Sequence, residues 1–532
     1  MKRIILYISL SLFLFFTKDT FAQPDKPVKC GFSVLMEQAK LGKITAAQMQ
    51  RPSLQYRYLT QDSVFLIHYS LEGGDAIDPT STNSQGIPDW VYEAEKALHK
   101  SYFTLVDSMG FPPPPMDSQS YPDEGDRRDG DPSGGARDIY IHDLSGSIYG
   151  ITRWEDEVIK TPTSDMARAS YTEIDNDYVE ANYYTHGVNA LRATIAHELF
   201  HQFHLAYTLK LEDVWWYEIS SSWFEDLVYP AVNDYIQYVS SYFASQSQPL
   251  HTSGGYKTAH YGYILNSYNE PTVWSDIWAN FVTERAYPAI DHALKDIGYS
   301  FAGSYRKFGA WNLLTGSRAI NGYGYPDAAE YPEITTSGAI TIPDSLPVAR
   351  SIPARDILYQ DLMHTGVGLE HYRLNFNPLD ARGGGSIAIP GSTNPVDFFL
   401  GKQTLSLTFP KSGMAGVGAL VNPVVDTTSI SISQEKKIVT FFPNTYVPAE
   451  HGNNIQIYTV LNEAGPIRAD LFDVTGRRVL KYNFGGQAFD SGPIQLTLPI
   501  EGQSTGKLSS GVYFLRLDAG NQTQTGKFVL IR

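Results

Sequence analysis

The chain has 532 residues, of which 42% are hydrophobic and 13% are aromatic. This length is too great for one hydrophobic core, so two to four domains are expected. The formal net charge of −16 repels nucleic acid and anionic membrane surfaces, so no nucleic-acid partner is expected.

The N-terminus has the pattern of a secretory signal. Lys2 and Arg3 precede an apolar run from Ile4 to Phe16, and small residues in Thr20-Phe21-Ala22 stand where a signal peptidase reads. Residues 1–22 are therefore expected to be a signal peptide of an exported protein. No later apolar run reaches the ~20 residues that a membrane-spanning helix needs, so no membrane span is expected in the mature chain.

Residues 23–58 show no clear periodicity. They form either a propeptide or a strap across the next domain, and the sequence leaves both open. This segment holds Cys30, the only cysteine of the chain. A single cysteine excludes an internal disulfide, and we also expect it to exclude a zinc site built on thiolates.

Residues 59–335 are expected to form an α+β domain, with strands before helices. An amphipathic helix begins at Pro88 and extends through Val106, and helical periodicity dominates from Asn189 to about Gly316. The acidic, glycine-rich stretch Asp123–Asp138 is expected to be a surface loop, with Ca2+ binding as its alternative role. The expected strands are Val64–Tyr69, Ile139–Ile141 and Ser170–Ile174.

After about Pro343 the pattern changes to short alternating runs between glycine and proline turns. This pattern predicts an all-β, sandwich-like accessory domain over residues 336–437 and a second all-β domain over residues 438–532. The expected strands of the last domain are Ile455–Tyr458, Ala469–Phe472 and Val512–Leu517.

The segment His197-Glu198-Leu199-Phe200-His201 carries the clearest chemistry of the chain. Histidines four residues apart share one helix face, so His197 and His201 can bind one Zn2+ ion, while Glu198 stays free to act on a water molecule. The alternative is a buried helix whose histidines are only hydrogen-bonded.

A catalytic zinc site needs a third protein ligand. His204 and Tyr207 stand where one class of zinc proteases has a glycine and a third histidine, which excludes that class. His204 is expected to lie near the ligands without binding the metal. Glu218 and Glu225 share a face of a second expected helix, and Glu218 is favoured because the small residues after it allow close helix packing.

The zinc helix and the segment Trp216-Tyr217-Glu218-Ile219-Ser220 together resemble the gluzincins, zinc peptidases whose third ligand is a glutamate on a following helix. The resemblance implies that Glu218 is the third ligand and that a downstream tyrosine, here Tyr261, stabilises the oxyanion. The alternative for Tyr261 is a packing aromatic in a tyrosine-rich helix. Glu225 is expected either to orient a ligand histidine or to be a solvated helix residue.

Residues 60 to about 320 more closely resemble a family of secreted bacterial zinc metalloproteases described from myxobacteria and their relatives. His204 departs from that family, which usually has glutamine there. Besides the zinc helix and the Glu218 segment, the resemblance rests on Phe65–Tyr69, Gly86–Val91, Ile174–Tyr178 and Tyr229–Tyr235.

The C-terminus resembles the sorting domains of the type IX secretion system of Bacteroidetes-like bacteria. The matching segments are Leu471–Val479, Ser510–Phe514 and Lys527–Arg532. The resemblance implies export through the periplasm of a Gram-negative bacterium, with the type IX machinery as partner. A plain β-sandwich accessory domain is the alternative.

These features together predict a secreted or cell-surface zinc peptidase that acts on a protein or peptide substrate, with Glu198 as general base. The alternative is a binding or adhesion protein whose metal domain has lost its activity.

Overall fold

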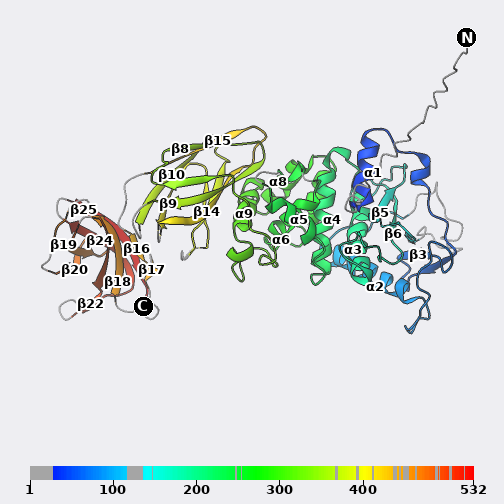
Figure 1. Ribbon diagram of the computed structural model, residues 1–532, viewed down its shortest axis with the longest axis horizontal. Helices are drawn as coiled ribbons and strands as arrows, with labels where there is room; N and C mark the ends of the chain where they lie inside the picture. Colours follow the sequence, from blue (N-terminus) through cyan, green and yellow to red (C-terminus); the bar gives the residue numbers. More distant parts are fainter. Residues whose placement is uncertain are drawn as a thin grey trace, which may run out of the picture.

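The computed structural model describes residues 28–116, 136–146, 148–245, 249–252, 254–365, 370–390, 395–409, 412–434, 440–442, 445–446, 454–461, 464–485, 489–490, 492–502, 506–519 and 522–532. It is a mixed α+β structure followed by β-sheets, as the sequence predicted. Figure 1 shows these parts one after another along the long axis, from the blue N-terminal part to the red C-terminal part.

The N-terminal part contains, among the described residues, a six-stranded sheet of order β1-β5-β6-β4-β3-β2. Strands β3, β4 and β6 run parallel, whereas β5 is antiparallel to β6. Strand β1 lies at the edge and pairs with β5 in the parallel direction. The bounds are β1 (Val28–Cys30), β2 (Tyr56–Leu59), β3 (Phe65–Tyr69), β4 (Arg137–Ile141), β5 (Ile148–Trp154) and β6 (Ser170–Ile174).

Helix α3 (Gly187–Leu205) is the centre of this part, because it contacts the helices α2 (Asp89–Phe103) and α4 (Val214–Val228) as well as β5 and β6. Gly150 of β5 allows the close approach to α3, since a Cβ atom there would lie 2.7 Å from Thr194 and 2.8 Å from Glu198. The other helices are α1 (Gly31–Lys40), α5 (Ile236–Phe243), α6 (Tyr261–Asn266), α7 (Val273–Phe281), α8 (Ala286–Asp296) and α9 (Phe301–Leu313).

Short helical turns connect these elements. One is a π-helical turn, η2 (Thr104–Ser108), and the others are 3-10 turns: η1 (Ala46–Met49), η3 (Leu211–Asp213), η4 (Leu250–Thr252), η5 (Tyr256–Thr258) and η6 (Gly316–Arg318). One apolar cluster runs from Cys30 through the helices to Leu314 and beyond. None of the described helices combines the length and the apolar character that crossing a bilayer requires.

The first β unit has a five-stranded and a four-stranded sheet with an apolar core between them. Its five-stranded sheet packs against α9 through β11 and β14. The bounds are β7 (Ala339–Ile342), β8 (Val348–Ile352), β9 (Asp356–His364), β10 (Glu370–Pro378), β11 (Gly384–Ala388), β12 (Asp397–Leu400), β13 (Gln403–Phe409), β14 (Gly413–Asn422) and β15 (Thr428–Gln434).

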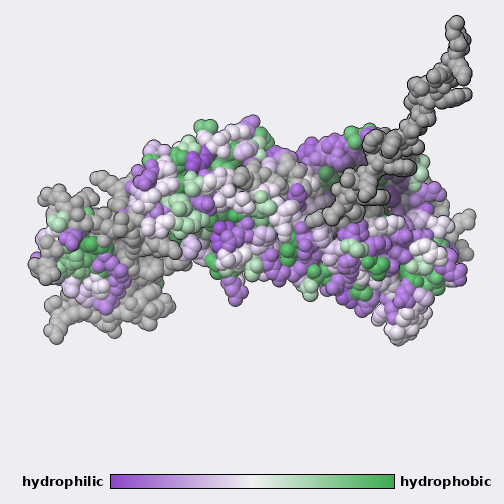
Figure 2. Space-filling view, in the orientation of Figure 1, coloured by the Kyte–Doolittle hydropathy of each residue, from purple (hydrophilic) through white to green (hydrophobic). Residues whose placement is uncertain are grey.

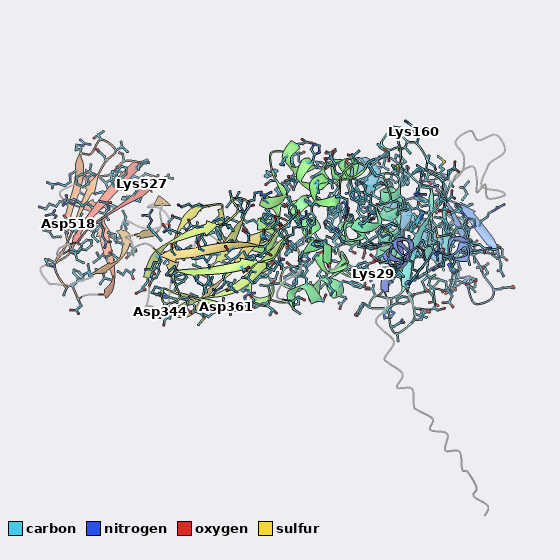
Figure 3. The ribbon with its side chains drawn as sticks, turned by 90° about the horizontal axis from the view of Figure 1, so that it is seen from above. Lys29, Lys160, Asp344, Asp361, Asp518 and Lys527 are labelled. Atoms are coloured by element: carbon cyan, nitrogen blue, oxygen red, sulfur yellow. The ribbon has the colours of Figure 1, made fainter. Side chains whose placement is uncertain are left out.

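The last β unit has its own apolar core, supplied by a three-stranded and a five-stranded sheet. A two-stranded ribbon of β22 and β23 accompanies them. Figure 3 labels Asp518 and Lys527 in this unit, at the opposite end of the molecule from Lys29. The bounds are β16 (Thr440–Phe442), β17 (Thr445–Tyr446), β18 (Asn454–Leu461), β19 (Ile467–Phe472), β20 (Arg478–Asn483), β21 (Gly492–Pro499), β22 (Glu501–Gly502), β23 (Gly506–Lys507), β24 (Gly511–Ala519) and β25 (Gln522–Leu530).

Periodicity located the long elements but not the short ones. The predicted strand Ser170–Ile174 coincides with β6, and the helix expected after Pro88 begins at Asp89. Sequence reasoning did not predict β1, β2, β5 and α1 of the N-terminal part. Strand β5 is buried along nearly its whole length and contains a glycine, so it lacks the alternation that marks a strand. The signal peptide and most of the Asp123–Asp138 loop lie outside the described residues, and the domain boundaries stay predictions.

Candidate metal centre

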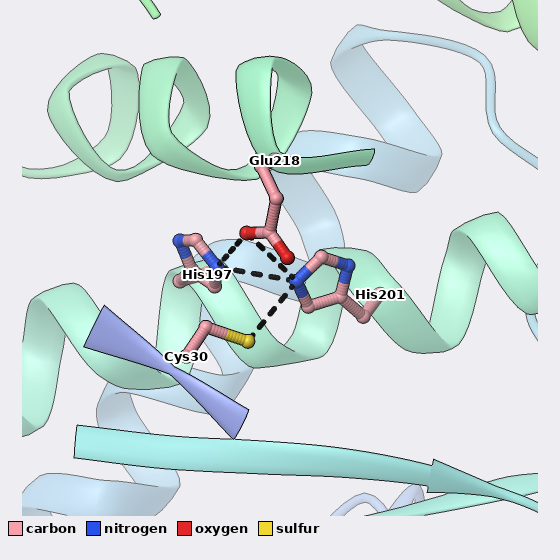
Figure 4. A group of neighbouring side chains, drawn as sticks. All are labelled: Cys30, His197, His201 and Glu218. Atoms are coloured by element: carbon pink, nitrogen blue, oxygen red, sulfur yellow. Dashed lines mark hydrogen bonds and ion pairs between the residues drawn. The ribbon is translucent and has the colours of Figure 1, made fainter. Parts of the chain in front are cut away.

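Helices α3 and α4 bring the three predicted metal ligands together. Oε2 of Glu218 lies 3.1 Å from Nε2 of His197 and 3.6 Å from Nε2 of His201. The two Nε2 atoms are 3.1 Å apart. Figure 4 shows the three side chains directed at one point between the two helices. One turn of α3 places both histidines on the side that faces α4.

Cys30 is the fourth member of this group, and the sequence did not predict it there. Its Sγ lies 3.5 Å from Nε2 of His201, and the four potential ligand atoms all lie within 4.8 Å of one another. The sequence excluded only a zinc site built on thiolates, and it gave no sign that the single thiol would lie beside the two histidines. The pairing of β1 with β5 carries Cys30 to the site across 171 positions of sequence, which no local pattern reveals.

The donor atoms fit a metal ion. A carboxylate oxygen of Glu225 lies 2.6 Å from Nδ1 of His197. Nδ1 donates there, so Nε2 of His197 carries a lone pair. Nδ1 of His201 lies 3.4 Å from the Ser221 hydroxyl, which leaves Nε2 of His201 facing the same point. Two lone pairs 3.1 Å apart repel each other unless a cation lies between them.

The spacing of the donors also suits one ion. Tetrahedral ligands at ~2.0–2.3 Å from zinc are about 3.3–3.8 Å apart. The three atoms of His197, His201 and Glu218 are 3.1 to 3.6 Å apart, and the Cys30 Sγ lies 3.5 Å from Nε2 of His201. Oε1 of Glu218 meets no hydrogen-bond donor in bonding geometry among the described residues, although it is buried. A buried carboxylate oxygen without a donor is costly, and a cation would offset that cost.

The group is closed off from solvent. Cys30, His201 and Glu218 are each 0% exposed and His197 is 1% exposed. Burial lowers the pKa of His197 to about 4 and lowers the pKa of His201 well below its usual value. Both imidazoles are therefore neutral near pH 7, which is the form that binds metals.

Glu225 joins the metal-ligand group to the N-terminal strand. Its second oxygen lies 2.7 Å from Nζ of Lys29, and Lys29 also pairs with Asp234. Burial would lower the pKa of Lys29, but the charges of Asp234 and Glu225 hold it well above its usual value. Glu225 thus orients His197, which was one of its two predicted roles. The other, a solvated residue, does not match its 3% exposure.

His204 lies beside the group and not in it. Its Nδ1 is 3.3 Å from Nδ1 of His201, and its ring stacks on Trp278 with centroids 4.0 Å apart. The ring of Phe32 stacks on that of His201, with centroids 4.2 Å apart. These contacts fix the plane of the His201 imidazole.

Glu198 lies next to the group, and only one of its two carboxylate oxygens accepts a hydrogen bond from a described nitrogen or oxygen. The Thr152 hydroxyl of β5 donates to Glu198, whose Oε2 lies 2.9 Å away and whose carbonyl oxygen lies 2.8 Å away. Oε1 of Glu198 accepts no hydrogen bond from a described nitrogen or oxygen. Burial raises the pKa of Glu198 to about 8, although the Cys30 thiol and Thr152 oppose the rise. A nearby cation would lower this pKa again.

Tyr261, the predicted oxyanion donor, is not brought to this group. It is fully buried, and its hydroxyl lies 2.7 Å from the Ser304 hydroxyl on α9. Tyr256, which sequence reasoning did not consider, lies at the site instead. Its ring stacks with that of His197 at 6.1 Å, and burial, together with the charge of Glu218, raises the pKa of Tyr256 well above its usual value. The left-handed Gly255 allows this approach, because a Cβ atom there would lie 2.5 Å from Glu218.

Asp143, Asp175 and Glu180 form another group of acids that could hold an ion among the described residues. This group is partly exposed, and exposed acids commonly gather without a metal. Calcium binding by the Asp123–Asp138 loop stays a prediction, because residues 117–135 lie outside the described part of the chain.

No family model and no curated protein matches the chain. Among solved structures, one match is PorZ, described as an essential bacterial surface component of the type-IX secretion system of Porphyromonas gingivalis. It is 20% identical over 18% of this chain and 11% of the PorZ chain, with a TM-score of 0.14. A β-glucuronidase from Faecalibacterium prausnitzii is 10% identical over 33% of this chain and 37% of its own, with a TM-score of 0.15. The trimeric ectodomain of the C. elegans fusion protein EFF-1 is 9% identical over 22% and 29%, with a TM-score of 0.14. Scores this low carry no argument about fold or function.

The geometry predicts different results for the two glutamates of α4. Glu218→Ala removes a metal-facing oxygen and is expected to yield protein without tightly bound metal. Glu225→Ala removes the partner of His197 and of Lys29 but no metal-facing oxygen, and it is expected to weaken metal affinity ~10- to 100-fold. Metal analysis of both purified variants after dialysis measures this difference. Retention of metal by Glu218→Ala together with its loss from Glu225→Ala would assign the ligand role to Glu225.

Proposed function

We propose that the protein is a secreted zinc-dependent peptidase with a zincin-like α+β domain of the gluzincin type, similar to the myxobacterial metalloproteases. The observation that carries the proposal is the convergence of two imidazole nitrogens and a carboxylate beside a second carboxylate, Glu198. Two histidines and a glutamate are a ligand set of catalytic zinc in peptidases. His197, His201 and Glu218 would hold the ion.

A zinc ion in this group would supply a Lewis acid for the scissile carbonyl and would lower the pKa of a water molecule. Glu198 takes a proton from the attacking water through its available oxygen and returns it to the leaving nitrogen. Thr152 fixes the carboxylate during both transfers by its hydrogen bond to Glu198. Glu225 keeps His197 in the tautomer that presents Nε2.

Strand β5 would offer a binding place for an extended peptide if β1 left its edge. It runs directly beside Glu198, and its edge away from β6 is the edge that pairs with β1. A peptide that adds to such an edge gains backbone hydrogen bonds regardless of its sequence. The proposed substrate is therefore an extended stretch of a protein or peptide.

Glu198→Gln is expected to keep the metal and to lose about 10²- to 10⁴-fold in hydrolysis rate, because the amide cannot accept the proton. The measurement is metal content together with hydrolysis of a denatured protein, with and without a chelator. Since the metal-ligand group is buried, each assay is run before and after limited proteolysis. Glu270→Gln, at an exposed glutamate, is the matched control. Loss of metal from Glu198→Gln would make Glu198 a ligand and reject its proposed role.

Tyr256 replaces Tyr261 as the proposed oxyanion donor. Its hydroxyl lies 3.0 Å from the Ser33 hydroxyl in the N-terminal segment, whereas the Tyr261 hydroxyl lies 2.7 Å from the Ser304 hydroxyl on α9. A donor must reach the oxygen on which charge develops.

The two tyrosines form a matched pair of variants. Tyr256→Phe is expected to lower kcat by about 10²-fold or more with little change in KM, because the lost hydrogen bond forms only in the transition state. Tyr261→Phe is expected to leave kcat near the wild-type value. Steady-state kinetics of both variants after limited proteolysis measures both. Equal kcat values for wild type and Tyr256→Phe would remove Tyr256 from the mechanism.

We also propose that the last β unit is a sorting domain read by the type IX secretion machinery. The proposal rests on the sequence segments that resemble such domains, and two of them form the start of β24 and the end of β25. The apolar core of this unit is separate from the cluster that contains the metal-ligand residues. A sorting domain with its own core can be bound by the secretion machinery independently of the catalytic domain.

Removal of residues from about Val439 onward is expected to retain the protein in the periplasm of its native host and to leave hydrolysis by the purified enzyme unchanged. Fractionation of host cells and the hydrolysis assay measure the two effects. Normal appearance of the truncated chain in the medium would reject the sorting role without affecting the peptidase proposal.

A further inference from the structure

We propose that residues 28–43 form an inhibitory segment, in which Cys30 occupies the position that water and substrate need, and that cleavage after α1 activates the enzyme. This inference rests on the proposed peptidase function. It assigns to the N-terminal segment a regulatory role that goes beyond holding the sheet together.

Cys30 takes the place that a catalytic metal site keeps open. His197, His201 and Glu218 already supply three ligands, and a catalytic zinc needs a fourth position for water or substrate. The Cys30 Sγ is within 4.8 Å of all three ligand atoms, and it approaches from β1, opposite α4 in Figure 4. A fourth protein ligand makes a closed, structural type of site.

The same strand occupies the proposed substrate edge. Val28 pairs with Ile148, and Cys30 pairs with Gly150, the residue of β5 that packs against Glu198. An extended peptide cannot add to β5 while β1 is there. One segment of three residues therefore blocks both the metal position and the peptide position.

The residues around Cys30 bind the other proposed functional side chains. Lys29 pairs with Glu225 and Asp234, Phe32 stacks on His201, and the Ser33 hydroxyl lies 3.0 Å from that of Tyr256. Phe32, Leu35 and Met36 then complete the cover, each at most 2% exposed. A plain structural strap would not need to contact a ligand histidine, the acid that orients the other ligand histidine and the proposed oxyanion donor at once.

The chain after α1 is suited to cleavage. Lys40, Leu41, Gly42 and Lys43 are exposed, and none belongs to the apolar core. Exposed turns are the usual sites of proteolytic nicking. Beyond this turn the chain is anchored again, because Arg51 pairs with Asp138 and Glu155. Hydrolysis of one peptide bond here, by another protease and water, separates the inhibitory segment from an anchored remainder.

Departure of the segment leaves the sheet whole. Strand β1 is an edge strand with only β5 as partner, so β5-β6-β4-β3-β2 remains a continuous sheet. Water then reaches the charges of Glu225 and Asp234, which need Lys29 only while they are buried.

The first test replaces the native metal of the full mature chain with Co2+, whose spectrum reports a sulfur ligand. Intact wild-type protein is expected to show a thiolate-to-cobalt charge-transfer absorption. The absorption is expected to disappear in Cys30→Ser and in wild-type protein that is cut by trypsin after Lys40 or Lys43 and separated from the peptide. Val34→Ala, at a 41% exposed position of α1, is the matched control and should keep the absorption. Identical spectra of wild type and Cys30→Ser would overturn the proposal.

The second test compares hydrolysis by intact and trimmed wild-type protein, so it does not depend on the folding of a variant. Trimming is expected to raise the rate by about tenfold or more, since only the fraction of molecules with an open site can bind substrate. Equal rates before and after trimming would overturn the inhibitory role and leave the peptidase proposal standing. Absence of hydrolysis from every zinc-loaded form, trimmed or not, would reject the peptidase proposal and the inhibitory role with it.

Discussion

The lone pairs of His197, His201 and Glu218 meet in a place that the protein has closed to solvent. Their donor atoms lie 3.1 to 3.6 Å apart, and such an arrangement is repulsive unless a cation compensates it. Close packing of the surrounding elements brings these three side chains together. Gly150 lets β5 lie on α3, and Gly255 lets the chain before Tyr256 lie on α4. Replacing either glycine with a larger residue would move a ligand-bearing helix.

A second constraint is the charge beside the ligands. Glu225 lies between Nδ1 of His197 and Nζ of Lys29, so one buried carboxylate serves a metal ligand on one side and an ion pair on the other. Buried carboxylates are costly without partners. The N-terminal segment supplies the positive partner in the closed form, and solvent can supply the same stabilisation in an open one. The electrostatics of the site therefore depend on whether the segment is docked.

The rest of the molecule is organised around this α+β part. Helix α9 joins it to the first β unit, whose strands β11 and β14 pack on that helix, while the last unit keeps a separate apolar core. On the face shown in Figure 2, hydrophobic residues of the described parts are scattered among hydrophilic ones. The proposed metal ligands His197, His201 and Glu218 all lie on helices of the N-terminal part. The proposed hydrolysis would therefore take place there and not in the β units.

Local patterns in the sequence were sufficient for His197, Glu198 and His201, because residues four apart on a helix share a face wherever that helix lies. The small residues after Glu218 similarly indicated the close approach of α4, and turn patterns indicated the all-β C-terminal part. The positions of Cys30 and Tyr256 depend on contacts between distant segments: Cys30 meets His201 across 171 positions, through a three-residue strand with no periodicity of its own. Sequence alone determined which residues could bind a metal from one helix, since helical geometry is local. Only the tertiary structure decided what closes that site, because edge pairing and burial depend on parts of the chain far apart in sequence.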